Sequence, residues 1–264
     1  MGQLVVSLCL TVFAASAFAQ GQKAYEPKIG QDGKDVIWVP TPLVVVEKMI
    51  DIAQVTARDY VIDLGSGDGI TVIAAAKRGA RALGIEYNPD LVRLSRRNAE
   101  NEGVSARAKF VKADLFESDF SQATVITLYL GLNLNLRLRP KILGLRPGTR
   151  VVSHVFTMYQ WSPDETATID GHDVNLWIVP AKVAGVWRTS QGELILRQEF
   201  QTIEGTIKNG GQAVPISGGR LRGDFLSFSA GGTVYSGRVS GNRIQGRVEL
   251  DGASSAWSAS RTRR

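Results

Sequence analysis

The chain has 264 residues, of which 44% are hydrophobic and 21% charged, and its formal net charge is +6. This composition is typical of a globular protein long enough for one large α/β domain and a smaller one, and it excludes a disordered or collagen-like chain. The single cysteine, Cys9, lies in an apolar N-terminal run, and there are only two histidines. A disulfide, a cysteine-ligated zinc and a catalytic cysteine are therefore excluded from the rest of the chain, and we expect no metal site.

Residues 1–19 have the pattern of an export signal. Residues 4–13 are almost wholly apolar, and Ala17-Phe18-Ala19 has the small-x-small form of a signal peptidase site. The run is shorter than the roughly 20 apolar residues of a transmembrane helix. The first positive charge, Lys23, follows the run instead of preceding it, which favours a membrane anchor with a cytoplasmic body. We expect export to the periplasm, with membrane association through this segment as the alternative.

Residues 20–184 alternate between strand and helix patterns. The expected strands cover 60–64, 81–87, 108–111, 125–130 and 149–156. The expected helices cover 43–52, 70–78, 88–101 and 134–145. The third helix has a clear beginning, because Asn88 can cap its free amides and Pro89 suits its first position. This alternation predicts an α/β fold with a doubly wound, Rossmann-like parallel sheet.

From residue 185 the pattern changes to short alternating runs between glycine-rich turns. The expected strands cover 194–200, 219–229, 233–239 and 243–250, with hairpin turns at Gly231-Gly232 and Gly241-Asn242. Residues 185–264 should therefore form a small antiparallel β-meander or open barrel, and they show no catalytic constellation. This part holds eleven Lys and Arg against six Asp and Glu. Such a mild basic surplus is common in β domains, and we expect no nucleic-acid partner.

A glycine cluster, Gly65-Ser66-Gly67-Asp68-Gly69, follows the first expected strand. Its glycines let the chain turn sharply and let the backbone approach a ligand, toward which the amides of the next helix point. Bulky Ile70 stands where a dinucleotide-binding motif has its third glycine. The carboxylates of Asp63 and Asp68 would also repel a pyrophosphate. The cluster therefore indicates a nucleotide-like ligand other than a nicotinamide or flavin dinucleotide.

Three carboxylates lie at or just beyond the carboxyl ends of three successive strands. Such sheets bind their ligands at this edge. Asp63 can hold the ammonium group of an amino acid, Glu86 can accept from both hydroxyls of a ribose, and Asp114 can accept from the adenine amino group. Each has an ordinary alternative, respectively a turn cap, a solvated strand end and a helix cap. Their joint placement favours a ligand that combines an amino acid with adenosine.

Motifs in this part resemble those of a known family. Residues 63–69, 84–89 and 113–116 resemble the class I, seven-strand S-adenosylmethionine-dependent methyltransferases. More narrowly, residues 39–42 and 128–137 resemble a branch with mitochondrial-type protein-lysine methyltransferases. The resemblance covers about residues 39–156 and implies S-adenosyl-L-methionine as cofactor. The residues expected to bind it are Pro40, Thr41, Asp63, Gly65, Ser66, Gly67, Asp68, Gly69, Glu86, Tyr87, Asn88, Asp114 and Leu115.

The expected catalytic residues are Tyr129, near the end of the fourth expected strand, and Asn133, which follows that strand. They would line the mouth of the site and orient the amine of a methyl acceptor. Tyr129 can equally be an aromatic packed at a strand end. His154, in the fifth strand, can act as a base or, more simply, pack in the core.

The resemblance implies methyl transfer to a lysine of a protein partner. Transfer from a sulfonium is a single in-line displacement that needs no metal. The chain departs from the branch at Ile70, where the branch often has Arg. It also departs at Gly131-Leu132, which replaces a Leu-Pro turn beside the expected acceptor pocket and leaves the acceptor open. Two alternatives therefore remain: a small-molecule methyltransferase with the same cofactor site, and a catalytically silent exported binding protein.

Overall fold

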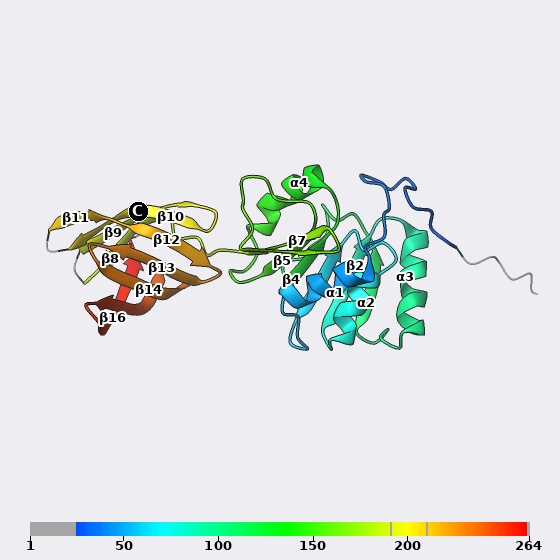
Figure 1. The fold of residues 1–264 in the computed structure, drawn as a ribbon, viewed down its shortest axis with the longest axis horizontal. Helices are drawn as coiled ribbons and strands as arrows, with labels where there is room; N and C mark the ends of the chain where they lie inside the picture. Colours follow the sequence, from blue (N-terminus) through cyan, green and yellow to red (C-terminus); the bar gives the residue numbers. More distant parts are fainter. Residues whose placement is uncertain (1–24, 191, 210, 263–264) are drawn as a thin grey trace, which may run out of the picture.

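The computed structural model describes residues 25–190, 192–209 and 211–262 as two lobes arranged along the long axis of the molecule (Figure 1). The expected signal or anchor at residues 1–19 lies outside the described residues. Among the helices of the described part, none is long and apolar enough to cross a membrane.

The first lobe is a seven-stranded sheet with helices. Its strands are β1 (Tyr60–Leu64), β2 (Arg81–Glu86), β3 (Ala108–Lys112), β4 (Val125–Leu128), β5 (Arg150–His154), β6 (Glu165–Ile169) and β7 (His172–Ile178). Its helices are α1 (Leu43–Ile52), α2 (Ile70–Lys77), α3 (Pro89–Asn101) and α4 (Leu132–Ile142). The strand order is β3-β2-β1-β4-β5-β7-β6, with the first five of these strands parallel and β7 antiparallel to β5. This order confirms the expected doubly wound, Rossmann-like sheet.

Both faces of the sheet are buried, which explains the continuous apolar runs of its strands. Neighbouring residues of β1 point to opposite sides: Val61 packs with α1, α2 and α3, whereas Ile62 packs with α4. The expected helix cap is also present, since the Asn88 side chain accepts a hydrogen bond of 2.8 Å from the amide of Asp90. The helix cap and the alternating burial of strand residues therefore determine where the strands end. The carboxyl ends of the strands form the edge at which a ligand is expected.

The hairpin of β6 and β7 was not predicted from the sequence. These strands pair antiparallel, with Ile169 opposite His172, and β7 then pairs with β5. No residue of β6 is fully buried, because it is the edge strand. Its sequence therefore lacks the apolar run that marks the inner strands.

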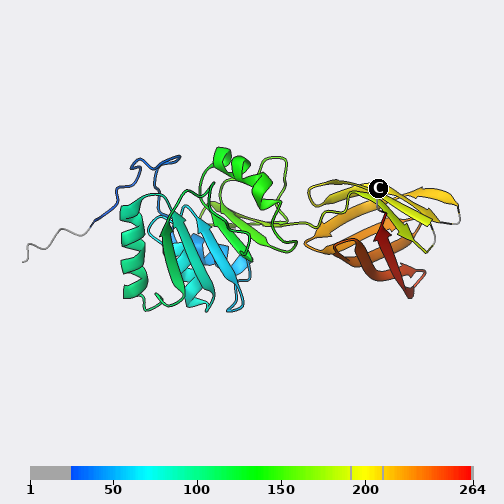
Figure 2. The same ribbon diagram turned by 180° about the vertical axis from the view of Figure 1, so that it is seen from behind.

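The second lobe contains the remaining nine strands, all in antiparallel pairs. They are β8 (Gly185–Thr189), β9 (Gly192–Glu199), β10 (Thr202–Asn209), β11 (Gln212–Pro215), β12 (Ser217–Arg222), β13 (Phe225–Ala230), β14 (Thr233–Ser240), β15 (Arg243–Leu250) and β16 (Ala253–Arg261). The run from β12 to β16 is the expected meander. It closes into a barrel because β16 pairs with β8, and β10 pairs with both β9 and β12 (Figure 2). The single strand expected over 219–229 is in fact two, broken at Gly223, whose φ of +62° makes a turn.

The barrel interior is a packed core. Trp187 and Phe228 are buried. The Phe228 ring stacks on Tyr235 with centroids 4.8 Å apart, and Trp257 meets Tyr235 edge-on at 5.5 Å. Side chains therefore fill the barrel, as is usual for eight or so strands.

The barrel is attached at the amino ends of the parallel strands. The amide of Gly148, just before β5, donates to Val179 O, and the amide of Ala181 donates to Gly223 O of the barrel. A Cβ on Gly223 would lie 2.9 Å from Gly148 Cα, so the two backbones touch. Because ligands bind at the carboxyl ends of such strands, the barrel lies at the opposite edge from the predicted site.

Candidate active site

The glycine turn after β1 can be formed only by glycine. The φ angles of Gly65, Gly67 and Gly69 are +79°, +53° and +86°, in the region that L side chains rarely adopt. A Cβ on Gly65 would lie 2.5 Å from Leu130 Cδ2, and one on Gly67 would lie 2.8 Å from Trp38 Nε1. Both positions therefore require glycine for conformation and for space.

Glu86, at the end of β2, is fixed by backbone amides. Its Oε2 accepts from the Gly67 amide at 3.0 Å and its Oε1 accepts from the Asn88 amide at 2.8 Å. The carboxylate thus joins the glycine turn to the beginning of α3. A ribose that approached it would meet oxygens already held in place.

Asp63, near the end of β1, is only 6% exposed. Its Oδ1 accepts from the hydroxyl of Thr127 on β4 at 2.6 Å, a contact that the sequence did not predict. Burial and the nearby charges of Glu86 and Asp68 raise the pKa of Asp63 to about 7, against the lowering effect of the Thr127 hydrogen bond. None of the ion pairs among the described residues includes Asp63.

The surroundings of Asp63 fit an amino-acid ligand. A buried carboxylate without a cation is costly, and a ligand ammonium would offset that cost. The buried Ser66 Oγ, beside the same cavity, has no hydrogen-bond partner among the described residues. The pair offers one acceptor for an ammonium and one donor for a carboxylate.

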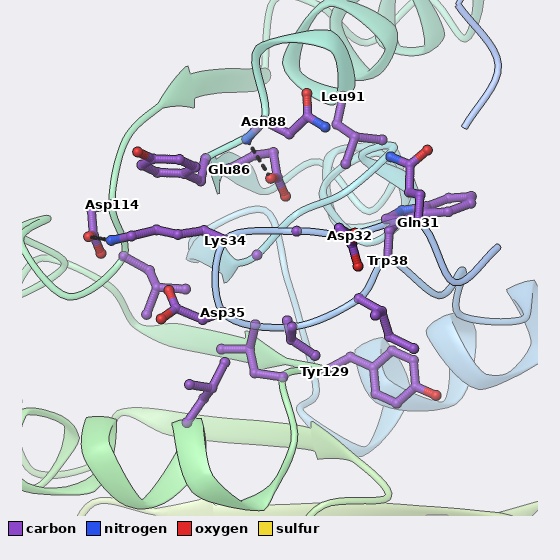
Figure 3. A pocket seen from close by; sticks show the side chains of 18 of the residues that line it. Gln31, Asp32, Lys34, Asp35, Trp38, Glu86, Asn88, Leu91, Asp114 and Tyr129 are labelled. Carbon is purple, nitrogen blue, oxygen red and sulfur yellow. Dashed lines mark hydrogen bonds and ion pairs between the residues drawn. The ribbon is translucent and has the colours of Figure 1, made fainter. Parts of the chain in front are cut away.

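Two cavities meet at this edge of the sheet. One, of about 80 Å³, is lined by the expected residues Glu86, Tyr87, Asn88, Asp114 and Leu115 (Figure 3). The other, of about 40 Å³, is lined by the expected residues Pro40, Thr41, Asp63, Ser66, Gly67 and Asp68. Gly65 and Tyr129 line both. The structure thus brings most of the expected residues around one site.

Two expected residues line neither cavity. Gly69 lies at the beginning of α2, where an added Cβ would be 2.7 Å from the side chains of Phe110 and Ser95. Asn133 is exposed on the first turn of α4. The role in ligand binding expected for these two residues stays a prediction.

A loop before α1, for which the sequence predicted no element, closes the larger cavity. Residues 31–38 line it together with the expected residues (Figure 3). The ends of the loop are joined by hydrogen bonds of 2.9 Å from the amide of Gly30 to Trp38 O and from the amide of Trp38 to Gln31 O. At its tip, Lys34 forms an ion pair with Asp114, which holds the pKa of that carboxyl below its usual value. The group expected to accept from adenine therefore has a partner from the chain itself.

Tyr129 stands at the junction of the two cavities, backed by other rings. Its ring lies 4.1 Å from His154 and 5.8 Å from Phe156, centroid to centroid. His154 is fully buried, and its Nε2 lies 3.0 Å from His172 Nδ1. Burial and His172 lower the pKa of His154 to about 4. A histidine so weakly basic and lining neither cavity supports the Tyr129 ring by packing.

Asn135, not Asn133, is the buried asparagine of α4. Its Nδ2 donates to Phe156 O at 3.1 Å and to Ser153 Oγ at 3.3 Å. It thereby ties the helix to the segment after β5 that carries Phe156. The sequence pattern placed the helix two residues late, so its buried face could not be assigned. Within the described part, no group of His, Cys, Asp and Glu could hold a metal ion.

Comparison with known proteins agrees with this geometry. The family model of the ANTKMT methyltransferase domain matches residues 63–165. A protein-lysine N-methyltransferase of Saccharolobus islandicus is 44% identical over 151 residues, covering 54% of this chain and 94% of that relative. The chain belongs to this methyltransferase family. The resemblance seen in the sequence motifs is thereby confirmed.

Two further similarities bear on the methyltransferase site. The adenine nucleotide translocase lysine N-methyltransferase of Mus musculus is 38% identical over 104 residues, and the match covers 39% of this chain and 45% of that relative. A crystal structure described as an RNA methyltransferase of Salinibacter ruber contains S-adenosyl-L-homocysteine. It is 49% identical, with a TM-score of 0.54, and the similarity covers 55% of this chain and 96% of that one. The expected cofactor, S-adenosyl-L-methionine, is therefore confirmed. The family model ends at residue 165, before the barrel begins.

Proposed function

We propose that the methyltransferase lobe transfers a methyl group from S-adenosyl-L-methionine to a lysine of a protein. The observation that carries the proposal is the buried carboxylate of Asp63, which lies beside a glycine turn and forms no ion pair among the described residues, with Glu86 at the end of β2 and Asp114 just after β3. The names of the relatives from Saccharolobus islandicus and Mus musculus support lysine as the acceptor.

Bound at this edge, the cofactor supplies a methyl group on a sulfonium. Asp63 would hold its ammonium, Glu86 its ribose hydroxyls, and Leu115 would contact its adenine. The chain would position these groups of the cofactor and leave the methyl group accessible from the side of the acceptor.

The acceptor would enter beside Tyr129, the aromatic residue shared by both cavities. Leu132, the first residue of α4, and Val155, directly after β5, are each 40% exposed and give this edge apolar character. An apolar mouth lowers the pKa of a lysine ammonium by desolvation. The lysine can therefore lose its proton to water before transfer, without a base from the chain.

Incubation of the full chain with isotope-labelled methyl donor and a lysate of the source organism tests the proposal. We expect label in protein, in methyl-lysine after hydrolysis, and none with Glu86→Ala. Calorimetry with S-adenosyl-L-homocysteine and circular dichroism show whether that variant is folded. Label confined to RNA or to small molecules would overturn the lysine assignment. No donor binding by a folded wild-type protein would favour a silent binding protein.

We further propose that residues 1–19 export the protein to the periplasm. Their apolar run and Ala17-Phe18-Ala19 support this, and a membrane anchor is the alternative. Cell fractionation with mass measurement of a C-terminally tagged chain tests it. A soluble periplasmic form that begins at Gln20 is expected. An intact chain in the membrane fraction would show an anchor instead.

A further inference from the structure

One side of the barrel carries a cluster of exposed arginines. Outward positions of β12 to β15 carry five exposed arginines: Arg220, Arg222, Arg238, Arg243 and Arg247. Strand register aligns them, because Phe225 is opposite both Arg222 and Arg238, and Ser236 is opposite Arg247. We call these five arginines, together with Phe225, Ser227 and Ser236, the arginine wall.

The other side of the barrel is balanced in charge. On β8 and β9, Arg188 is directly opposite Glu193, and Arg197 is directly opposite Glu204 of β10. Lys208 Nζ also lies 3.6 Å from Glu193 Oε2. Basic and acidic side chains on β8, β9 and β10 therefore balance, three against three. Apart from Arg261, whose guanidinium donates to the carbonyls of Lys182 and Ala184, the arginines of the described barrel strands that lack a facing or paired carboxylate lie on the arginine wall.

Most of the wall has no internal counter-charge. Arg238 pairs with Asp224 at 2.6 Å, and Arg220 pairs with Asp164 of the first lobe at 3.1 Å. Among the described residues, Arg222, Arg243 and Arg247 form no ion pair. All three side chains are exposed. The Nε of Arg247 donates to Ser254 Oγ at 2.9 Å, and its other donors, with those of Arg222 and Arg243, can meet an anion. Arginine forks suit the oxygens of phosphate particularly well.

The sequence alone predicts no nucleic-acid partner, but from the placement of these arginines we propose instead that the arginine wall binds single-stranded nucleic acid. Phe225 is 41% exposed between Arg222 and Arg238, which places an aromatic ring between two phosphate-binding groups. Bases stack on such rings while the backbone follows basic side chains. Serines between the arginines, such as Ser227 and Ser236, add hydroxyl donors.

The curvature of the wall favours this partner over a membrane. A barrel wall is convex, so a flat lipid surface would touch only a narrow strip of it, whereas a flexible strand can follow several β-strands. The wall belongs to the lobe attached opposite the cofactor edge, so the proposal stands independently of methyl transfer. The barrel would hold a nucleic acid without presenting it to the cofactor.

Fluorescence anisotropy of the full chain with a labelled oligo-dT of about 20 nucleotides tests the proposal. We expect binding whose affinity falls steeply with salt. The triple variant Arg222→Ser/Arg243→Ser/Arg247→Ser should lose at least tenfold in affinity, and its salt slope should fall by about 2, since each single-strand phosphate contact contributes about 0.7. Phe225→Leu, which keeps an apolar side chain, should lose about fivefold or more by removing the stacking surface.

The matched control is Arg188→Ser/Arg197→Ser/Lys208→Ser, which removes three basic side chains from the balanced side. It should bind oligo-dT within about twofold of wild type at the low salt of about 50 mM. Serine already occupies neighbouring outward positions, and thermal melting shows whether each variant is folded. The proposal is overturned by absence of oligo-dT binding, by an equal loss in the control, or by binding to phosphatidylglycerol vesicles that oligo-dT does not compete away.

Discussion

The two lobes place their ionisable side chains in opposite ways. In the first lobe, Asp63 is 6% exposed and His154 is fully buried, both at the carboxyl ends of strands. In the barrel, the interior is apolar and aromatic, and the charged side chains of its described residues lie only on the outer surface. A buried charge demands a specific partner, whereas an exposed one meets any counter-ion. The first lobe is thus built to select one ligand, and the second to attract a class of partners.

The lobes should also be separable in stability, and Gly246→Ala tests this with the largest expected effect. Gly246 of β15 faces Gly237 of β14, and its Cβ would lie 1.8 Å from the backbone oxygen of Ser236. Neither strand can yield without losing the ladder, so we expect a loss of about 3 kcal/mol in the stability of the barrel. Calorimetry should show a lower melting transition for the barrel with unchanged affinity for S-adenosyl-L-homocysteine.

The control for this experiment is Gly241→Ala. Its φ is +56°, but nothing lies within 4 Å of the added Cβ. It should cost about 1 kcal/mol, from backbone conformation alone. Gly246→Ala could instead abolish binding of S-adenosyl-L-homocysteine at temperatures below the melting transition of the variant. That result would show that the two lobes unfold as one cooperative unit and are not separable in stability.

Asp63→Asn should affect only the first lobe. The amide keeps the shape and the Thr127 contact but cannot neutralise a ligand ammonium. We expect the affinity for S-adenosyl-L-homocysteine to fall about 100-fold, since breaking a buried charge pair costs several kcal/mol. Oligo-dT binding by the barrel should not change. The exposed Glu117→Gln serves as control, and a similar loss in that variant would show that net charge, not Asp63, governs affinity.

The pH dependence of ligand binding provides a finer test of Asp63. Its pKa is about 7 in the folded chain against an ordinary 3.8. A raised carboxyl pKa means that the folded state holds the proton more tightly, so stability from this group is full below about pH 4 and is lost as pH rises to 7. The ligand ammonium needs the ionised form. Affinity should therefore rise about tenfold per pH unit up to about 7 and then level off.

Calorimetric titrations between pH 5 and pH 8 would measure this slope. Asp63→Asn should remove both the rise in affinity and the loss of melting temperature over the same range. A slope that persisted in the variant would assign it to another titrating group. The salt dependence of oligo-dT binding, by contrast, should show no inflection near pH 7, because arginine stays protonated.

Local rules account for what the sequence predicted. Asn88 and Pro89 mark a helix beginning by bonds within a few residues, and apolar runs mark buried strands. The carboxylates of Asp63, Glu86 and Asp114 could be brought together because parallel strands end at one edge. These arguments need no knowledge of distant contacts. They predicted the five parallel strands and brought most of the expected site residues to one edge, but not the β6–β7 hairpin or the loop of residues 31–38.

The features that were missed depend on partners far along the chain. Lys34 and Asp114 are 80 positions apart, and nothing near residue 34 indicates an ion pair. The pairing of β16 with β8 closes the barrel through strands separated by most of the lobe. The buried role of Asn135 was missed because helix phase, which decides the buried face, depends on where α4 begins. Non-local contacts of this kind leave no periodic trace in the sequence.

The ion pair between Lys34 and Asp114 gives the smallest expected effect. The two side chains are 37% and 14% exposed, so solvent screens their attraction more than it screens any charge near Asp63. The adenine amino group would compete with Lys34 for the same carboxylate. Lys34→Met should therefore bind S-adenosyl-L-homocysteine about two- to fivefold more tightly, within the range of exposed ion pairs.

Stopped-flow fluorescence would follow this change, since Trp38 lines the same cavity. Association should become faster in Lys34→Met, and added salt should speed the wild type toward the variant by screening the pair. Lys28→Met, also exposed and close in the chain but without an ion pair among the described residues, controls for lost charge. Weaker binding by Lys34→Met would mean that the loop holds the ligand in place. In that case Lys34, at the tip of the loop, would bind the ligand together with Asp63.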